Sequence, residues 1–342
     1  MTRALDGPVA SVVVPTYRRA ARLPQLVEAL EAQDFAEEFE VVIVDDGSPD
    51  ETWRTLEQLS NDRSIAVRPY QLSTNSGPAT ARNEGWHRAL ADRIAFLDDD
   101  CLPQPGWLTA MERGLEPADV VQGRTLPDPT QAANVGPFSR TMQIKGENGF
   151  YATCNIGYRR DILERVGGFD ENFRHPATTR GVRRQRRVAA ILDGEDVDLA
   201  WRAKEAGAST AFEHDALVHH EVRPGSMREH VGYLRRRSGV VRLVNSHPGM
   251  RARLFRGVFI QPSHAHALLA TIGIGLVARS RHQSMRLGGA ALIASYVRTR
   301  QREPLGGLSS PRVVDLPLAL ASDLAEIGVL AVASVRQRTV VL

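Results

Sequence analysis

Two clusters of acidic residues carry the clearest chemistry in this sequence. Asp98, Asp99 and Asp100 directly follow the apolar run RIAFL, and Glu195 and Asp196 precede a segment with helical spacing. Neighbouring carboxylates can share a hard cation such as Mg²⁺ or Mn²⁺, which in turn binds phosphate oxygens. A single carboxylate can also take a proton from a hydroxyl group. The sequence therefore combines groups suited to metal binding with groups suited to proton transfer.

The spacing within each cluster suggests how its side chains are presented. The alternation of an extended chain predicts Asp98 and Asp100 on one side and Asp99 on the other. The alternative is a solvated turn whose aspartates only cap a helix. Gly194 before Glu195 marks a helix start, where the helix dipole favours an ionised carboxylate. Dipole compensation alone is the alternative for that second cluster.

Strands that alternate with helices are expected to position these acids. The predicted strands cover residues 10–14, 40–44, 65–72 and 93–97, and the predicted helices cover 22–33, 51–59 and 79–91. This order favours an α/β fold with a parallel sheet. Ligands bind such sheets beyond the carboxyl ends of the strands. The polar segments 15–17, 45–48 and 98–100 should therefore converge on one crevice.

Composition excludes several classes of protein. With 42% hydrophobic and 24% charged residues, the chain is neither disordered nor fibrous. Cys101 and Cys154 are too few for a disulfide framework or a Cys₄ zinc site, so a reducing compartment is expected. No glycine fingerprint follows the first strand and no Walker loop occurs, which disfavours nicotinamide and P-loop enzymes. Residues 1–8 hold no signal-peptide core, so a cytoplasmic location is expected.

Several motifs, taken in order, resemble a known family. They are SVVVPTYR at 11–18, VIVDDGS at 42–48, NSGPATARNEG at 75–85 and FLDDD at 96–100, followed by GGFDE at 167–171 and GEDVDL at 194–199. Together they resemble the bacterial, inverting family-2 glycosyltransferases with the GT-A fold, over residues 9 to about 225. The resemblance implies a mostly parallel central sheet. It also implies transfer of a sugar from a nucleotide diphosphate, most often a UDP-sugar, to a hydroxyl acceptor.

The same resemblance implies roles for individual residues. The nucleotide-sugar side would comprise Pro15, Thr16, Tyr17, Asp46, Gly77, Arg82, Asn83, Asp98 and Asp99. Asp100 would be the principal ligand of Mn²⁺ or Mg²⁺, with Asp98 beside it. A histidine would complete the metal shell, and His220 fits the strand register better than His219, although a one-residue slip stays open.

The remaining implied roles concern the acceptor. Asp196 would be the catalytic base that takes the acceptor proton, and Glu195 would orient it or help to bind acceptor. Asn155 would contact the donor sugar or acceptor. Trp201 could form an apolar platform for the acceptor, and core packing is the equally weighted alternative.

The C-terminal part differs in charge from the rest. Residues 1–222 carry 25 basic and 35 acidic residues, a net charge of −10, whereas residues 223–342 carry 18 arginines and 5 acidic residues, a net charge of +13. We therefore expect a catalytic domain over 1–225, with its nucleotide half near 9–110 and its acceptor half near 111–225. A basic helical region over 226–342 would follow it.

This basic region suits the surface of an anionic bilayer. Its apolar segments 265–278, 287–297 and 316–335 are short or carry charge, and none is predicted to span a membrane. We expect peripheral contact with the inner face of the cell membrane and a lipid-linked or cell-envelope acceptor. The alternative is that these helices pack on one another or form the interface of a homo-oligomer.

Other readings of the sequence are weaker. The six arginines of 174–187 could clamp a diphosphate or an anionic acceptor, or could simply be solvated, and no nucleic-acid-binding motif accompanies them. A nucleotidyltransferase would need a basic glycine-rich signature after the first strand, which is absent. A non-catalytic sugar-nucleotide or membrane-binding protein would not need all the acids of both clusters.

Overall fold

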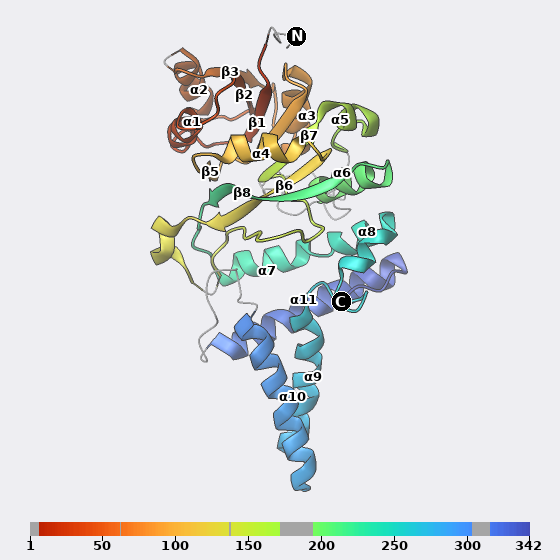
Figure 1. The fold of residues 1–342 in the computed structure, drawn as a ribbon. Helices are drawn as coiled ribbons and strands as arrows, with labels where there is room; N and C mark the ends of the chain where they lie inside the picture. Colours follow the sequence, from red (N-terminus) through yellow and green to blue (C-terminus); the bar gives the residue numbers. More distant parts are fainter. Residues whose placement is uncertain (1–6, 62, 137, 172–193, 303–314) are drawn as a thin grey trace. The chain divides into compact units, whose positions relative to one another are not determined.

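A computed structural model describes residues 7–61, 63–136, 138–171, 194–302 and 315–342. The chain divides into two compact units (Figure 1). The first comprises Met1–Pro129 with Met142–Glu221, and the second comprises Thr130–Thr141 with Val222–Leu342. The second unit includes an earlier segment that the sequence-based division at residue 225 leaves in the catalytic part. The reason is backbone pairing, because the N–H of Arg140 donates to Arg223 O at 2.8 Å and the N–H of Arg223 donates back at 3.0 Å.

The first unit is built on one eight-stranded sheet of order β3-β2-β1-β4-β7-β6-β8-β5. The strands are β1 (Ala10–Thr16), β2 (Phe39–Asp45), β3 (Ala66–Gln71), β4 (Arg93–Leu97), β5 (Cys101–Pro103), β6 (Val120–Pro127), β7 (Asn155–Arg159) and β8 (Thr210–His220). The first four strands of the chain are parallel, as predicted. The rest of the sheet is mixed, because β7 is antiparallel to both of its neighbours and β5 is antiparallel to β8. The predicted α/β class is confirmed.

Helices cover both faces of this sheet. They are α1 (Leu23–Glu31), α2 (Thr52–Asn61), α3 (Pro78–Arg88), α4 (Trp107–Leu115), α5 (Arg160–Val166) and α6 (Glu195–Glu205). The kinked 3₁₀ element η1 (Pro129–Asn134) follows β6, and all of it after Pro129 belongs to the second unit. Side chains of α1, α2 and α4 share a buried apolar cluster with Val12 and Val14 of β1. Val13 points to the opposite face, where it meets Gly85 of α3. Burial on both faces explains why β1 reads as a continuous apolar run.

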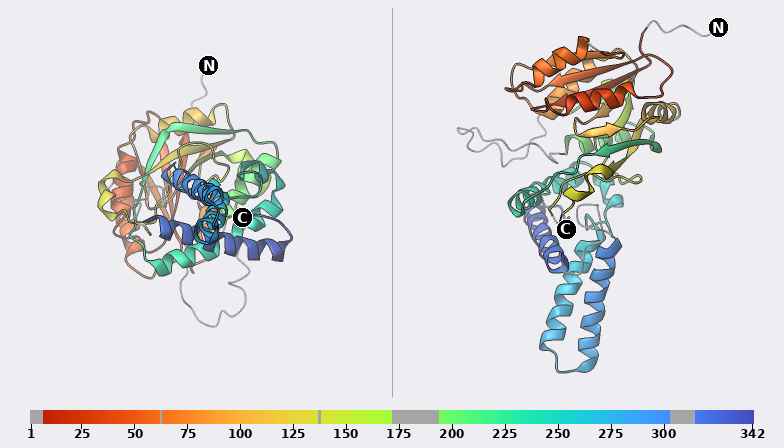
Figure 2. Two further views of the ribbon diagram at one scale, coloured as in Figure 1. Left: turned by 90° about the horizontal axis from the view of Figure 1, so that it is seen from below. Right: turned by 90° about the vertical axis from the view of Figure 1, so that its left-hand side faces the viewer.

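The second unit is helical. It contains α7 (Met227–Arg236), α8 (Gly239–Ser246), the short η3 (Pro248–Arg253), α9 (Pro262–Arg279), α10 (Gln283–Arg302) and α11 (Leu316–Gln337). Figure 2 shows α9 and α10 side by side as an antiparallel hairpin. The two helices approach closely at glycines, since a Cβ on Gly273 would lie 2.5 Å from the carbonyl oxygen of Gly289. A larger residue at either position would push the helices apart.

Helix α11 carries two acids that the second unit buries. Asp323 pairs with Arg300 of α10 and accepts a hydrogen bond of 2.9 Å from the Tyr296 hydroxyl. Glu326 pairs with Arg237 at 2.6 Å. Burial alone would raise the pKa of Glu326, but Arg237 and the buried His264 hold it at about 2. Among the described helices, α11 alone is long and apolar enough to cross a membrane by length and composition. Its buried ion pairs instead bind it to α10 and to the residue after α7.

Candidate active site

The carboxyl ends of the first strands converge, as the sequence predicts. Thr16 ends β1, and its hydroxyl donates to Asp99 Oδ2 at 2.8 Å. The N–H of Asp46 donates to the carbonyl oxygen of Thr16 at 2.9 Å, which places the end of β2 beside the end of β1. Pro15 and Tyr17 flank Thr16 and are half-buried. The polar residues after β1, β2 and β4 therefore meet at one edge of the sheet.

Asp46 fixes the loop that leads into α3. Its Oδ1 accepts from the N–H of Ser76 at 2.6 Å, and its Oδ2 accepts from the N–H of Gly77 at 2.9 Å. Burial raises the pKa of Asp46, and the two N–H donors oppose that effect. Gly47 permits the close approach, because a Cβ there would lie 2.8 Å from the backbone carbon of Thr74. In this structure Asp46 therefore supports the loop with both of its oxygens.

The three aspartates after β4 do not alternate. The prediction that Asp98 and Asp100 lie on one side and Asp99 on the other is wrong. The chain turns after Leu97, where the N–H of Cys101 donates to the carbonyl oxygen of Asp98 at 3.1 Å. This turn directs Asp98 toward Arg82, whereas Asp99 and Asp100 both contact Arg19. The extended-chain period applies only to strands, and the strand ends one residue before the cluster.

Arg82 joins the two acidic clusters. This buried side chain places Nη2 at 2.8 Å from Asp98 Oδ1 and Nη1 at 3.2 Å from Glu195 Oε1. Its guanidinium also lies over the ring of Phe169, 5.7 Å from the centroid. A buried guanidinium needs such carboxylate partners, because an unpaired charge in this position is costly. The bridge brings the first turn of α6 to the edge of the sheet where Asp98 lies.

Asp196 lies in the first turn of α6, next to Glu195. Its Oδ1 accepts a hydrogen bond of 2.8 Å from the N–H of Val197. Burial, together with the charge of Glu195, raises the pKa of Asp196 to about 7. A carboxyl with a pKa in this range can exchange a proton near neutral pH. The arginine-rich segment 174–187, which precedes this helix, lies outside the described residues.

A candidate metal site lies where β5 pairs with β8. Cys101 is paired with His220, and the N–H of Glu221 donates to the carbonyl oxygen of Asp100 at 2.8 Å. This register places His220 Nε2 at 3.5 Å from Asp100 Oδ1. His219 alternates away from Asp100, so the structure brings His220 and not His219 to it. Asp100, Cys101 and His220 offer ligand atoms within 4.8 Å of one another.

Two residues that the sequence analysis did not select complete this region. Arg19 contacts three carboxylates: its Nε lies 3.3 Å from Asp99 Oδ1, its Nη2 3.5 Å from Asp100 Oδ2, and its Nη1 3.4 Å from Glu221 Oε2. The available signals were the position of Arg19 just after Tyr17 and that of Glu221 just after His220. Neither signal indicates that residues 19 and 221 meet, because their contact depends on the pairing of β5 with β8.

Three other candidates are directed into the protein. The Asn83 amide donates to Phe169 O and Glu171 Oε1, and it accepts from the indole of Trp86 and the N–H of Phe169. The fully buried Asn155 accepts from Trp107 Nε1 at 2.8 Å and donates to two backbone carbonyl oxygens. The buried Trp201 donates from its indole to the carbonyl oxygen of Gly149 at 3.0 Å. All three side chains thus anchor neighbouring segments.

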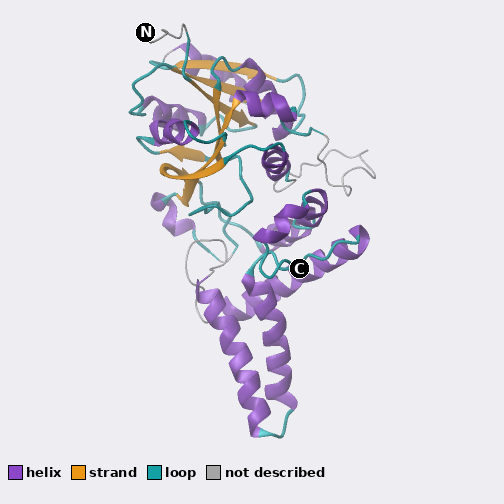
Figure 3. Ribbon diagram, turned by 45° about the vertical axis from the view of Figure 1, so that its right-hand side comes forward, coloured by secondary structure: helices purple, strands orange, loops and turns teal. Residues whose placement is uncertain are grey.

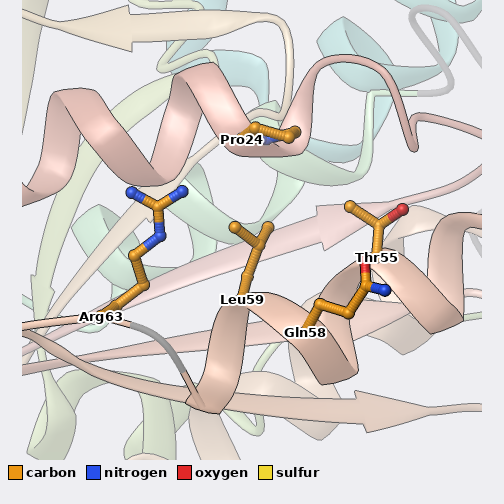
Figure 4. A pocket seen from close by; sticks show the side chains of 5 residues that line it. All are labelled: Pro24, Thr55, Gln58, Leu59 and Arg63. Carbon is orange, nitrogen blue, oxygen red and sulfur yellow. The ribbon is translucent and has the colours of Figure 1, made fainter.

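A small pocket between α1 and α2 is separate from these residues. Figure 4 shows its lining side chains, which are Pro24, Thr55, Gln58, Leu59 and Arg63. None of them belongs to the candidate site, and none is a carboxylate or a histidine. The pocket therefore adds no group to the chemistry described above.

Comparison with known proteins decides the family. The family model described as glycosyl transferase family 2 matches residues 11–167. Glycosyltransferase AglE of Haloferax volcanii is 30% identical over 232 residues, which cover 64% of this chain and 68% of AglE. The chain belongs to glycosyl transferase family 2. A further relative of this glycosyltransferase is validoxylamine A glucosyltransferase of Streptomyces hygroscopicus subsp. jinggangensis. The two are 28% identical over 294 residues, which cover 74% of this chain and 65% of that protein.

A solved structure supports the fold of this family-2 glycosyltransferase. The mannosyltransferase PcManGT from Pyrobaculum calidifontis, in complex with GDP-Man and Mn²⁺, matches with a TM-score of 0.63 and 16% identity, over 95% of this chain and 87% of that chain. The predicted GT-A fold is thereby confirmed. The chain spans about two thirds of the length of AglE and of the validoxylamine enzyme. The family match ends before Glu195, so the second acidic cluster and His220 lie beyond it.

Proposed function

We propose that this glycosyltransferase inverts the anomeric centre of a nucleotide-diphosphate sugar, first of all a UDP-sugar, as it transfers the sugar to a hydroxyl acceptor. The bridge through Arg82 carries this proposal. It links Asp98, on the side proposed for the nucleotide, to Glu195, the neighbour of the proposed base Asp196. The buried guanidinium of Arg82 thus holds the proposed metal- and diphosphate-binding region next to the proposed proton acceptor.

In the proposed reaction Asp196 is the general base. Its carboxylate takes the proton of the acceptor hydroxyl while that oxygen forms a bond to the anomeric carbon of the donor. The bond from the anomeric carbon to the diphosphate oxygen breaks, and its electron pair leaves with the nucleoside diphosphate. Attack from the side opposite the leaving group inverts the configuration. The pKa of about 7 leaves a large share of Asp196 ionised at neutral pH.

Asp100 and His220 are the proposed ligands of a divalent cation, Mn²⁺ or Mg²⁺, with Asp98 at the edge of the site. Their donor atoms fit such an ion, because a carboxylate oxygen and an imidazole nitrogen lie 3.5 Å apart and face each other. The Cys101 thiol is a softer donor and suits these ions less well. When bound, the cation would offset the negative charge of the leaving diphosphate. The Mn²⁺ in the PcManGT structure supports this assignment.

The remaining residues of the nucleotide-sugar side fall into groups according to their contacts in the structure. We propose that Pro15, Thr16 and Tyr17 border the base and ribose, with Asp99 held in place by Thr16. Asp46 and Gly77 shape the loop before α3, through which the backbone can approach the diphosphate. For Asn83, Asn155 and Trp201 we propose positioning roles, since their polar atoms are bonded within the protein.

The acceptor and location follow from the basic second unit. We propose that the enzyme works at the inner face of the cell membrane on a lipid-linked or cell-envelope acceptor. The net charge of +13 over residues 223–342 supports contact with an anionic membrane surface.

The decisive experiment is release of nucleoside diphosphate from a panel of UDP- and GDP-sugars, with Mn²⁺, Mg²⁺ or EDTA. We expect release from at least one sugar nucleotide, dependent on the cation and increased by acceptor. Product configuration, read by NMR of the anomeric proton, should be opposite to that of the donor. Retention of configuration, or full activity in EDTA, would contradict the proposal.

A further inference from the structure

The distal half of the α9–α10 hairpin, residues 269–290, exposes large apolar side chains; we term it the hairpin tip. Ile272 is 57% exposed and Leu287 is 64% exposed, and three others accompany them: Leu269, Ile274 and Met285. Among the described residues, the first unit contributes only Leu90 to the exposed large apolar side chains. Apolar side chains gathered in this way indicate a contact surface rather than ordinary scatter.

The fold of the second unit leaves this tip uncovered. At the base of the hairpin, Ala267, Ala270 and Tyr296 share a buried cluster with Ile327 of α11. Beyond the cluster, α9 and α10 contact each other through Gly273 and Gly289. Figure 3 shows no other described helix of this unit alongside the tip. Leu276 and Ile293 line this contact beside the two glycines, whereas Ile272, Ile274 and Leu287 remain exposed to solvent.

The chain around the hairpin tip carries only positive charge. Residues 230–302 contain thirteen arginines and no aspartate or glutamate. At the tip itself Arg279, Arg281 and Arg286 are exposed, and none of them makes an ion pair with a described residue. Apolar side chains interspersed with unpaired arginines match the boundary between lipid headgroups and acyl chains.

We infer that the hairpin tip binds the surface of an anionic lipid bilayer. Ile272, Ile274 and Leu287 enter the headgroup–acyl boundary, and the tip arginines contact lipid phosphates. This inference rests on the membrane location proposed above and deepens it by naming the element and the lipid charge. A second copy of the chain is a poor occupant, because it would bring a second set of unpaired arginines to the contact.

The contact is interfacial and leaves the second unit folded. A membrane span by α11 would withdraw Asp323 and Glu326 from Arg300 and Arg237 and would place two acids in hydrocarbon. The hairpin tip needs no such rearrangement, since its side chains are already exposed. The structure therefore favours insertion of the tip by a shallow depth, about 5–10 Å.

Vesicle sedimentation with the full chain tests the inference, without donor or acceptor. We expect binding to vesicles that contain phosphatidylglycerol and little binding to phosphatidylcholine alone. R279E/R281E/R286E should lower the partition coefficient roughly tenfold or more, and I272S/I274S/L287S should lower it as well. The matched control R54E/R159E/R165E changes net charge equally on the first unit, and it should bind like the wild type. Melting curves verify that each variant is folded.

A fluorescent label locates the contact. Cys101 and Cys154 are buried, so an environment-sensitive dye attached through Ala278→Cys reports on the tip, and one attached through Leu90→Cys serves as the control. Only the tip label should shift to the blue with anionic vesicles.

Equal binding to neutral vesicles, or no loss in the tip variants, would overturn the inference. Dimers that the tip variants abolish would also overturn it in favour of self-association. Donor turnover is measured separately, so failure of vesicle binding leaves the proposed reaction standing.

Discussion

Arg82 Nη1 lies 3.2 Å from Glu195 Oε1, and this contact joins α3 to the first turn of α6 across 113 residues of sequence. The same guanidinium holds Asp98 at 2.8 Å. Because both acidic clusters share the buried guanidinium of Arg82, Asp196 lies beside the edge of the sheet where Thr16, Asp98 and Asp100 gather.

Asp196→Asn tests the base directly. We expect turnover to fall by about 10²- to 10⁴-fold, because the amide cannot take the acceptor proton. Affinity for the nucleotide sugar, measured by calorimetry, should be nearly unchanged. Asp198→Asn is the matched control, since Asp198 is in the same helical turn but pairs with Arg202 at 2.7 Å. Turnover of Asp196→Asn at the wild-type level would reject the base assignment.

The pH profile of turnover should reflect Asp196. Because only the ionised carboxylate accepts a proton, kcat/KM should rise with pH around an apparent pKa of about 7. The charge of Glu195 contributes to this raised pKa, so Glu195→Gln should move the rising limb to lower pH. A limb that stays in place in Glu195→Gln would mean that another group controls it.

Asp196 should also lower the stability of the folded protein at high pH. Its pKa is raised when folded, so its contribution to stability is fully present below about pH 4 and is lost as pH rises through about 7. Asparagine carries no charge and escapes this loss. We therefore expect Asp196→Asn to raise Tm by a few degrees at about pH 8 and to change it little near pH 4. An equal shift at both values would rule out titration as the cause.

Arg19→Gln should destabilise the protein when no divalent cation is present. The substitution leaves Asp99, Asp100 and Glu221 without their shared guanidinium, and Tm should fall by about 2–5 °C. Mn²⁺ should raise the Tm of this variant more than that of the wild type, because the cation replaces the lost charge. The Arg54–Glu51 pair is 73% exposed on both sides, so Arg54→Gln should change Tm very little. Identical Mn²⁺ effects on all three proteins would refute this account.

Gly85→Ala tests the packing that supports the site. A Cβ at Gly85 would collide with Val13 of β1, so α3 would have to move away from the sheet. We expect a loss of about 1–3 kcal/mol in the free energy of unfolding, measured by urea titration. At Gly146 a Cβ would meet nothing within 4 Å, and Gly146→Ala should cost less than about 0.5 kcal/mol. Similar costs at both positions would contradict the packing argument.

The sequence by itself determined the parallel strands β1 to β4, the polar residues at their carboxyl ends and the two acidic clusters. Those features are local, because a buried parallel strand is a continuous apolar run and its end is marked by the next polar residues. The sequence also determined the charge difference between the two parts of the chain. The match with glycosyl transferase family 2, over residues 11–167, includes these strands and the first acidic cluster and ends before the second.

Only the tertiary structure decided which side chains meet. The turn after Leu97 separates Asp98 from Asp99 and Asp100, and no sequence period predicts it. The pairing of β5 with β8 selects His220 over His219 and brings Glu221 to Arg19. These contacts join residues up to 202 positions apart, and their geometry depends on strand register and helix packing, which local composition does not encode.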